Sequence, residues 1–354
     1  MIKDKVVVQI LVYNEPVEMI DRLFSSLMAT DYPRGMWEIS VLNNYCEGRD
    51  DIERVVALRW IKEFHEHGLR IRFTKQNPNL GFAGGHDRLF RGTSGLEPEF
   101  VYLLNADAVV DPGFLKEAVA AAGGAPKAAL VQSRIMLEQD PKLLNSYGNA
   151  MHFLGFGFTL GYRCLPGADG YPVSQKRLPM FYPSGAGVLA RVEAIRRVGG
   201  LFDPRYFLYH EDSDLGWRAI LAGYEVRYAP KSVIFHRYEF SKSIKKFYWI
   251  ERNRYVNLFV FYKFRTLLLI ALPAFVMECG AFLFSIRSGW WQEKLRVAAF
   301  FCRPSTWKWI GERRRLARSV RVRKDSDVLA FMIGEISNQE VDSPLLTRVV
   351  NPVM

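Results

Sequence analysis

The chain of 354 residues is 49% hydrophobic and 24% charged, which is enough apolar material for a buried core and excludes an intrinsically disordered protein. Its 17 Pro and 27 Gly residues are ordinary usage and exclude a fibrous or low-complexity chain. The four cysteines lie far apart without a C-x-x-C pair, which argues against a zinc ribbon or a disulfide framework and favours a reducing compartment.

The net charge of +11 is unevenly distributed along the chain. From residue 251 to the end there are 17 Lys and Arg residues against nine Asp and Glu residues, a surplus of +8. A nearly balanced body with a basic tail predicts that the tail contacts an anionic surface. The first residues enter a short apolar run without the long apolar region of a signal peptide, so no such peptide is expected.

The first hundred residues alternate between strand-like and helix-like patterns. Short apolar runs predict strands at 6–12, 37–42, 69–73 and 100–104. Apolar residues at helical spacing predict helices at 16–28, 52–64 and 81–90. Such alternation builds βαβ units, so we expect the α/β class, with a parallel sheet covered by helices.

The middle of the chain is less regular. Residues 143–183 are rich in Gly, Pro and aromatic residues and predict loops and short strands. Helices are expected at 188–198, before Gly199-Gly200, and at 215–221, before Gly223. A short apolar strand is expected at 232–235.

The composition changes after about residue 250, which predicts a body over 1–250 and a helical, basic and aromatic region over 251–354. Residues 266–286 carry one charge, Glu278, and are long enough to cross a bilayer, although Pro273 and Glu278 argue against a span. Residues 303–324 hold nine basic residues beside Trp307 and Trp309, which is typical of a helix lying on anionic lipid. The alternative is an ordinary helical subdomain packed on the body.

Polar clusters follow three of the predicted strands, where ligands of open α/β sheets bind. They are Tyr13-Asn14-Glu15, Asn43-Asn44 and Asn105-Ala106-Asp107. A carboxylate at the end of a buried strand, such as that of Asp107, can hold a divalent cation. Each cluster can also be explained by ordinary turn chemistry, because Asn and Asp favour turns.

A second acidic cluster, His210-Glu211-Asp212-Ser213-Asp214, precedes a predicted helix. The helix dipole accounts for one acid at such a position, and Asp214 is the one we assign to it. A remaining carboxylate that faces a pocket would be a good general base. His236 follows an apolar run in the same way as Asp107, and the two together favour a metal site over a purely structural histidine.

Taken in order, these motifs resemble those of the inverting family 2 glycosyltransferases with the GT-A fold, especially the bacterial rhamnosyltransferase-like branch. The resemblance covers roughly residues 5 to 260. The matching motifs are Val12-Tyr-Asn-Glu15, Asn79-Leu-Gly-Phe-Ala-Gly-Gly85, Leu104-Asn-Ala-Asp107, Ser184-Gly-Ala-Gly187, Gly200-Leu-Phe-Asp-Pro-Arg-Tyr-Phe207, His210-Glu-Asp-Ser-Asp-Leu215, His236 and Glu251-Arg-Asn-Arg254.

The resemblance implies a role for each matched position. Asp107 is implied as the metal-binding acid of a DxD-like motif, with Asn105 in place of its first Asp, and His236 completes the metal site. Asp212 matches the catalytic base, with Glu211 beside it shaping the acceptor site. The positions implied to bind the nucleotide sugar are Tyr13, Glu15, Asn43, Gly81, Gly85, Asn105, Ala106 and Arg252, the last of these near the diphosphate.

Two segments depart from the family pattern. After the second strand the family usually shows V-D-N-x-S-x-D, whereas here Asn43, Cys46 and Gly48 replace Asp, Ser and the last Asp. An amide donates as well as accepts, so Asn43 changes the hydrogen bonds offered to the base. His86 and Asp87 stand where Asn is common, which alters the expected sugar contacts.

The implied function is the transfer of a sugar from a nucleotide-diphosphate sugar to a glycan or lipid-linked glycan acceptor, with Mn²⁺ or Mg²⁺ as cofactor. One candidate donor is dTDP-rhamnose, and the expected location is the cytoplasmic face of a membrane, with peripheral attachment through the tail. An alternative is a non-catalytic scaffold that binds nucleotide sugars at the membrane. A nucleic-acid binder is not expected, because the basic run lies among tryptophans without a recognisable nucleic-acid module.

Overall fold

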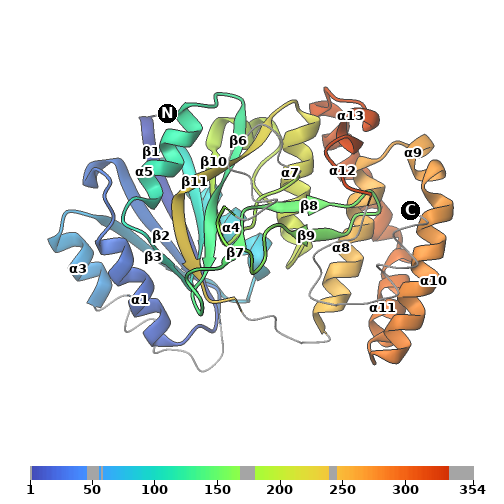
Figure 1. Cartoon of the computed structure of the whole chain (residues 1–354), viewed down its shortest axis with the longest axis horizontal. Helices are drawn as coiled ribbons and strands as arrows, with labels where there is room; N and C mark the ends of the chain where they lie inside the picture. Colours follow the sequence, from blue (N-terminus) through green and yellow to red (C-terminus); the bar gives the residue numbers. More distant parts are fainter. Residues whose placement is uncertain (1, 46–55, 57–58, 168–179, 239–244, 335–354) are drawn as a thin grey trace.

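The computed structural model describes residues 2–45, 56, 59–167, 180–238 and 245–334. A twisted sheet forms the body, and a group of helices from the last third of the chain packs at one end of it (Figure 1). The strands are β1 (Ile2–Val12), β2 (Trp37–Asn43), β3 (Arg70–Lys75), β4 (Pro98–Asn105), β5 (Ala108–Val110), β6 (Ala128–Leu137), β7 (Leu144–Ser146), β8 (Asn149–Met151), β9 (Gly157–Thr159), β10 (Gly187–Arg191) and β11 (Glu225–His236).

The main sheet has nine strands in the order β3-β2-β1-β4-β10-β6-β11-β5, with β7 paired to β6. The first four strands in this order are parallel, as predicted. Strand β10 is antiparallel to both β4 and β6, and β5 is antiparallel to β11, so the sheet is mixed rather than wholly parallel. The predicted loops and short strands of 143–183 are confirmed in the described part by β7, β8 and β9.

Helices cover both faces of the sheet. They are α1 (Val17–Met28), α3 (Ile61–Glu66), α4 (Gly81–Arg91), α5 (Phe114–Gly123), α6 (Val192–Arg197), α7 (Glu211–Leu221), α8 (Lys245–Phe261), α9 (Phe264–Leu269), α10 (Ala271–Arg287), α11 (Trp291–Phe301), α12 (Pro304–Val320) and α13 (Asp325–Leu329), with short 3-10 turns at Arg34–Met36 and Pro204–Tyr206. Of the helix predicted over 52–64, residues 52–55 and 57–58 lie outside the described part, and α3 begins at Ile61.

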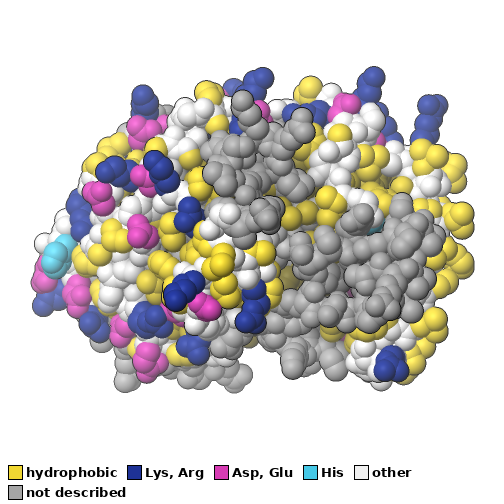
Figure 2. Space-filling view, viewed as in Figure 1, with side chains coloured by type: hydrophobic (Ala, Val, Ile, Leu, Met, Phe, Trp, Pro, Cys, Tyr) yellow, Lys and Arg dark blue, Asp and Glu magenta, His cyan; other side chains and the backbone are white. Residues whose placement is uncertain are grey.

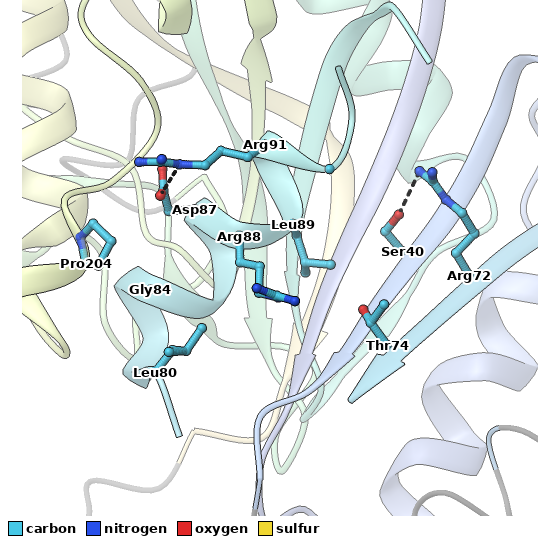
Figure 3. Close-up of a pocket in the computed structure, with 11 residues that line it drawn as sticks. Ser40, Arg72, Thr74, Leu80, Gly84, Asp87, Arg88, Leu89, Arg91 and Pro204 are labelled. Carbon is cyan, nitrogen blue, oxygen red and sulfur yellow. Dashed lines mark hydrogen bonds and ion pairs between the residues drawn. The ribbon is translucent and has the colours of Figure 1, made fainter. Parts of the chain in front are cut away.

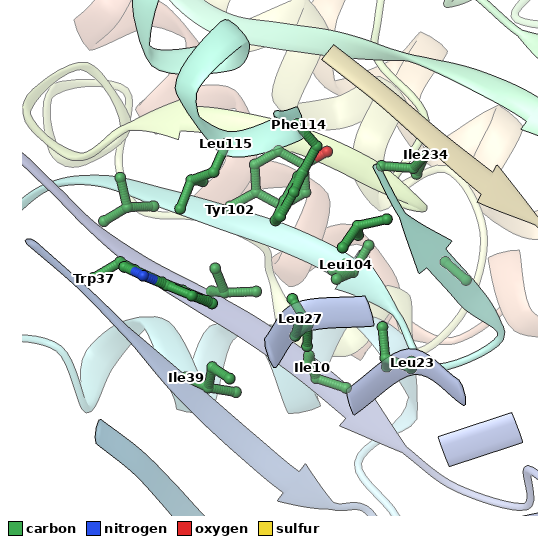
Figure 4. Close-up of a cluster of buried hydrophobic side chains, with 14 of the residues drawn as sticks. Ile10, Leu23, Leu27, Trp37, Ile39, Tyr102, Leu104, Phe114, Leu115 and Ile234 are labelled. Carbon is green, nitrogen blue, oxygen red and sulfur yellow. The ribbon is translucent and has the colours of Figure 1, made fainter. Parts of the chain in front are cut away.

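The alternation of β1 explains how two cores form. Val8 and Ile10 face α1 and α5 in one buried cluster, where Leu23 and Phe114 pack against them (Figure 4). Val7 points to the opposite face and joins a second cluster with residues of α4, α6, α7, α8 and α12. Successive side chains of a strand point to opposite faces, so a continuous apolar run is what a strand buried on both faces requires.

Two predicted elements need correction. The helix expected over 188–198 is strand β10 followed by the short helix α6, so its first four residues extend the sheet instead. Val188 and Leu189 are β-branched or bulky residues that pack between β4 and β6, and this burial overrides the helical spacing. The strand expected at 232–235 is the end of the 12-residue strand β11.

The tail is bound tightly to the body. Residue 250 lies within α8, and the second core cluster contains Val256 of α8 and Trp309 and Ile310 of α12 beside strand residues. The sequence predicts that the basic run lies on anionic lipid. Trp309 does not contact lipid in this way, because its side chain is buried in the protein core. In the described part of the chain, no helix has both the length and the hydropathy that crossing a bilayer requires.

Asp214 lies in the first turn of α7, as its predicted helix-dipole role requires, and it also joins this tail to the body. Its carboxylate is fully buried and accepts hydrogen bonds from Arg218 Nε at 2.8 Å and from Arg313 Nη2 of α12 at 2.6 and 2.7 Å. Tyr206 also donates to it, at 3.1 Å. Arg218 and Arg313 therefore neutralise the buried charge of Asp214, which has lost its solvation by water.

Replacing Arg313 with Ala should destabilise the fold, because Asp214 would keep only one of its two cations. Removal of one partner from a buried ion pair typically costs about 3–5 kcal/mol. Urea unfolding of Arg313→Ala measures this loss. Arg315→Ala, an exposed position on the same helix, is the control and should change the free energy of unfolding by less than about 0.5 kcal/mol. Equal effects of the two variants would contradict the role given to Arg313.

Candidate active site

The polar clusters predicted at the strand ends lie at one edge of the sheet. The register pairs Val12 of β1 with Asn43 of β2, and Leu11 of β1 with Asn105 of β4. Because these strands are parallel and adjacent, the residues that follow them emerge side by side. The three polar clusters therefore follow adjacent strands at one edge of the sheet.

Glu15 binds the turn after β1. Its carboxylate accepts hydrogen bonds from the main-chain N–H groups of Tyr13 at 2.8 Å and Asn14 at 3.2 Å. Burial raises the pKa of Glu15, and the negative charge of Asp107 adds to this shift. The two carboxylates therefore belong to one electrostatic site. The Tyr13 side chain is 45% exposed at the rim of this site.

The end of β2 holds a pair of buried amides. Asn44 donates to Asn79 Oδ1 at 2.9 Å and accepts from the main-chain N–H of Leu80 at 2.9 Å, so it fixes the glycine-rich turn before α4. Asn43 is 3% exposed, and its Oδ1 has no hydrogen-bond partner within the described residues. The replaced positions Cys46 and Gly48 lie outside the described residues.

The two predicted glycines allow close packing of α4. Gly81 has a φ of +69°, and a Cβ there would lie 2.3 Å from the main-chain oxygen of Phe207. A Cβ at Gly85 would lie 2.4 Å from Leu11 of β1. Glycine is therefore required at both positions, whether or not they also contact a ligand. His86 lies on the buried side of α4, where burial lowers its pKa to about 3, so it is not exposed to a sugar.

Asn105, Asp107 and His236 meet where β4 and β11 end. Asp107 Oδ1 lies 3.1 Å from His236 Nε2, and Asn105 Nδ2 lies 3.3 Å from the same nitrogen. His236 is largely buried, and its other nitrogen, Nδ1, lies 3.0 Å from Asn145 Oδ1. Ala106 is buried between the two polar residues of the motif.

The contacts of His236 test whether a cation fits. The amide oxygen of Asn145 accepts hydrogen bonds, so Nδ1 carries a proton and Nε2 is the nitrogen that faces Asp107. A lone pair and a carboxylate at 3.1 Å require a proton or a cation between them. The pair therefore fits a divalent metal. No group of three or more metal-binding His, Cys, Asp or Glu side chains occurs in the described ranges, so a bound ligand would have to supply further oxygens.

Glu211 and Asp212 open α7 next to this edge. Burial raises the pKa of Asp212 to about 7, against the lowering effect of the main-chain N–H groups of Ser213 and Gly185. Burial and the charge of Asp212 also raise the pKa of Glu211, whose Oε2 is buried without a partner in the part of the chain that the structure describes. A carboxylate with a pKa near neutrality can accept a proton and release it again, as a general base must.

The main chain before these acids is held in an unusual conformation. Phe207, Tyr209 and His210 have positive φ values of 64°, 66° and 66°. Asn253 of α8 donates from Nδ2 to the main-chain oxygens of Tyr206 at 3.0 Å and Tyr209 at 2.7 Å. These bonds offset the strain that non-glycine residues meet at positive φ.

Asn257, one turn later on α8, supports the same region. Its Nδ2 donates to Ser213 Oγ at 2.9 Å, and its Oδ1 shares the one hydroxyl proton of Tyr206 with Asp214. Sequence reasoning missed Asn253 and Asn257 as residues of the site. The motif Glu251-Arg-Asn-Arg254 contains Asn253, but the resemblance assigns a ligand role to Arg252 alone.

The contacts of Arg252 are with the loop before α7 and with its own helix. Its Nη2 donates to the main-chain oxygens of Arg205 at 2.7 Å and Tyr206 at 2.9 Å, and its guanidinium lies 4.3 Å from the ring centroid of Trp249. These contacts make Arg252 part of the loop support. The predicted approach to a diphosphate stays a prediction.

A separate hollow of about 700 Å³ lies between α4 and the strands β2 and β3 (Figure 3). Arg72 on one side donates to Ser40 Oγ at 3.2 Å, and Arg91 on the other side pairs with Asp87 at 2.7 Å. Asp87, which the family resemblance links to sugar contacts, lines it, whereas the residues predicted for the metal, the base and the nucleotide sugar are not among its lining side chains. The hollow is therefore distinct from the polar edge described above.

Solved structures share this fold at low sequence identity. A structure of GalNAc-T7 with UDP, GalNAc and Mn²⁺ aligns over 73% of this chain and 48% of its own, with a TM-score of 0.58 and 14% identity. A structure of the Pyrobaculum calidifontis mannosyltransferase PcManGT with GDP-Man and Mn²⁺ aligns over 89% of this chain and 86% of its own, with a TM-score of 0.52 and 18% identity. The fold is thus the GT-A fold of these glycosyltransferases.

Two relatives match parts of the sequence. The N-acetylglucosaminyl-diphospho-decaprenol L-rhamnosyltransferase of Mycobacterium tuberculosis is 45% identical over 58 residues, which is 16% of this chain and 19% of that protein. Glucomannan 4-beta-mannosyltransferase 7 of Arabidopsis thaliana is 26% identical over 225 residues, which is 63% of this chain and 37% of that protein. The chain therefore spans well under half the length of these relatives.

A sequence profile supplies the family. The profile described as "Glycosyltransferase like family 2" matches residues 5–257, a range that begins in β1 and ends in α8. This range contains every predicted site residue, from Tyr13 to Arg252, and more than half of the chain. The chain belongs to the glycosyltransferase family 2-like family.

Proposed function

We propose that this protein is an inverting, metal-dependent glycosyltransferase that moves a hexosyl group from a nucleotide-diphosphate sugar to a hydroxyl of a lipid-linked or cell-surface glycan. One observation carries the proposal. The metal-compatible pair Asp107 and His236 and the carboxylate of Asp212, whose pKa burial raises to about 7, lie on either side of the segment 185–186. In this segment the main-chain oxygen of Ala186 accepts from the N–H of Asn105 at 3.2 Å, and the neighbouring Gly185 faces Asp212.

Asp107 and His236 would hold the cation, with Asn105 beside them. A carboxylate and an imidazole, completed by diphosphate oxygens, are compatible with Mn²⁺ or Mg²⁺. Such a cation supplies neutralisation of the charge that develops on a leaving diphosphate. Asn145 keeps the His236 ring oriented toward Asp107, as the outer partners of metal-binding histidines commonly do.

Asp212 would remove the proton of the acceptor hydroxyl as that oxygen attacks the sugar. A single displacement inverts the anomeric centre and needs one base and no covalent intermediate. Glu211, beside it, would shape the acceptor site, with its buried Oε2 available to an acceptor hydroxyl. General-base assistance of this kind is typically worth about 10²–10⁴-fold in rate.

The donor would lie along the strand ends. The exposed ring of Tyr13 offers a stacking surface for a base, and the free Oδ1 of Asn43 offers an acceptor where the family usually has a carboxylate. The short match to a rhamnosyltransferase makes dTDP-rhamnose the first donor to test. The donor site would comprise Tyr13, Glu15, Asn43, Gly81, Gly85, Asn105 and Ala106.

Replacement of Asp212 with Asn should lower turnover by about 10²–10⁴-fold while leaving donor affinity nearly unchanged. The variant should also be at least as stable as the parent at pH 8, because the folded state disfavours the charged form of this buried carboxyl. Initial rates and calorimetric titration with the nucleotide measure the two effects. Near-normal turnover in Asp212→Asn would reject the assignment of the base.

The pH dependence should follow the same carboxyl. Only its ionised form accepts a proton, so kcat should fall as the pH drops below about 7, the pKa to which burial raises Asp212. Fold stability should change in the opposite direction and decline as the pH rises from about 4 to 7. A rate profile that is flat between pH 5 and 8 would contradict the proposal.

The metal site should be visible without turnover. With Mn²⁺ present, a nucleotide diphosphate at about 100 times its Kd should stabilise the protein by roughly 2.7 kcal/mol, seen as a thermal shift. In Asp107→Asn the metal-dependent part of this shift should disappear, whereas Asp140→Asn, an exposed control, should retain it. A shift that persists in Asp107→Asn would remove this residue from the metal site. Ligand binding without turnover of any nucleotide sugar would favour the non-catalytic scaffold.

A further inference from the structure

Helices α9 and α10 expose large apolar side chains along their outer side. On α10 these follow helical spacing, so they lie on one face of that helix, and α9 continues the row with Leu269, which is 80% exposed. Single exposed apolar residues are normal, but a contiguous set of this size marks an interaction site. We call this set the apolar face; it consists of Phe264, Leu268, Leu269, Leu272, Phe275, Val276, Phe282, Leu283 and Ile286.

The apolar face lies at the outer end of the molecule. In Figure 1, α9 and α10 form the edge farthest from α1 and α3, and in Figure 2 apolar side chains line this edge. An apolar groove of about 410 Å³ beside it, lined in part by Phe282, Leu295 and Trp307, extends the surface onto α11 and α12. The apolar surface is therefore continuous over several helices.

The charges around the apolar face have one sign. Lys263 and Arg265 precede or begin α9, and Arg287 ends α10; all three are exposed, and the described residues offer them no ion-pair partner. The single acid in this stretch, Glu278, points inward and pairs with Arg254 and Lys294. The face thus has cations at both ends and no exposed carboxylate on the described helices α9 and α10.

We propose that the apolar face rests on an anionic lipid bilayer, with α10 parallel to the membrane plane. The 17 residues of α10 span about 26 Å at ~1.5 Å per residue, less than the ~30 Å of a hydrocarbon core. A helix with a wide apolar side and cations at its edges instead lies at the level of the lipid headgroups. There the three cations meet lipid phosphates while the apolar side chains enter the acyl region.

Charge favours lipid over a second copy of this chain. A two-fold contact through the apolar face would bring Lys263, Arg265 and Arg287 of both copies together, with no exposed acid on the face to offset them. An anionic bilayer supplies the missing negative charge. Within the tail over 251–354 that the sequence predicts to attach to a membrane, the proposal assigns the contact to α9 and α10 and not to the basic run, because Trp309 and Arg313 of α12 are buried. It does not depend on the proposed chemistry.

The test is co-sedimentation of the full chain with vesicles of phosphatidylcholine alone or mixed two to one with phosphatidylglycerol. We expect binding to the mixed vesicles that weakens with salt, because exposed charges are screened. The double substitution Leu268→Ser/Leu272→Ser should lower the partition coefficient about 100-fold, since two leucines would no longer enter the lipid. Arg265→Gln/Arg287→Gln should lower it about fivefold for each cation removed.

The control is Val322→Ser, which alters an apolar residue that is 77% exposed but outside the apolar face. It should bind vesicles like the parent, and thermal unfolding should show that all variants keep their fold. Should the leucine variant unfold, the arginine variant decides, because its changed groups lie in solvent. Full binding by both double variants, equal loss in the control, or a dimer in sedimentation velocity that the leucine substitutions dissociate would overturn the proposal.

Discussion

The rest of the site depends on the hydrogen bonds and ion pairs that the buried carboxylate of Asp214 accepts. Arg218 of its own helix, Tyr206 of the preceding loop and Arg313 of α12 all donate to it, from positions up to 99 residues away. A buried charge is tolerated only when its partners are in place, so the loop, α7 and the tail must assemble together. The start of α7, and with it Asp212, takes its position from this assembly.

Two acids on the first turn of α7 therefore have opposite electrostatic environments. Asp214 is enclosed by two cations and stays a fixed structural anion. Asp212, two residues earlier, has main-chain N–H donors and no ion pair with any described residue, so burial raises its pKa to about 7. The fold thus neutralises the carboxylate that anchors α7 and leaves unneutralised the one that could exchange a proton. Asn253 holds the loop before them, in which Tyr209 and His210 have positive φ values.

Much of the sheet and the strand-end cluster could be predicted from the sequence, since both follow from local patterns. Apolar runs identified β1, β2 and β4, and parallel pairing then required Tyr13, Asn43 and Asn105 to meet. Contacts between distant segments could not be predicted. The pattern of Val188 and Leu189 fits helix and strand alike, and only their neighbours β4 and β6 decide. Likewise, the sequence does not distinguish Arg313 from the other cations of the basic run, because only the packing of α12 brings it to Asp214.

The two sides of α8 connect the site with the outer helices. Asn253 and Asn257 face the strained loop. Glu251 and Arg254 face the outer helices, where Glu251 pairs with Lys294 of α11 and Arg254 pairs with Glu278 of α10. Buried ion pairs with several partners resist displacement, because each partner left alone would be an uncompensated charge. The helices that carry the apolar face are therefore held at a set position relative to Asp212. A surface bound at that face would therefore lie at a defined distance from Asp212.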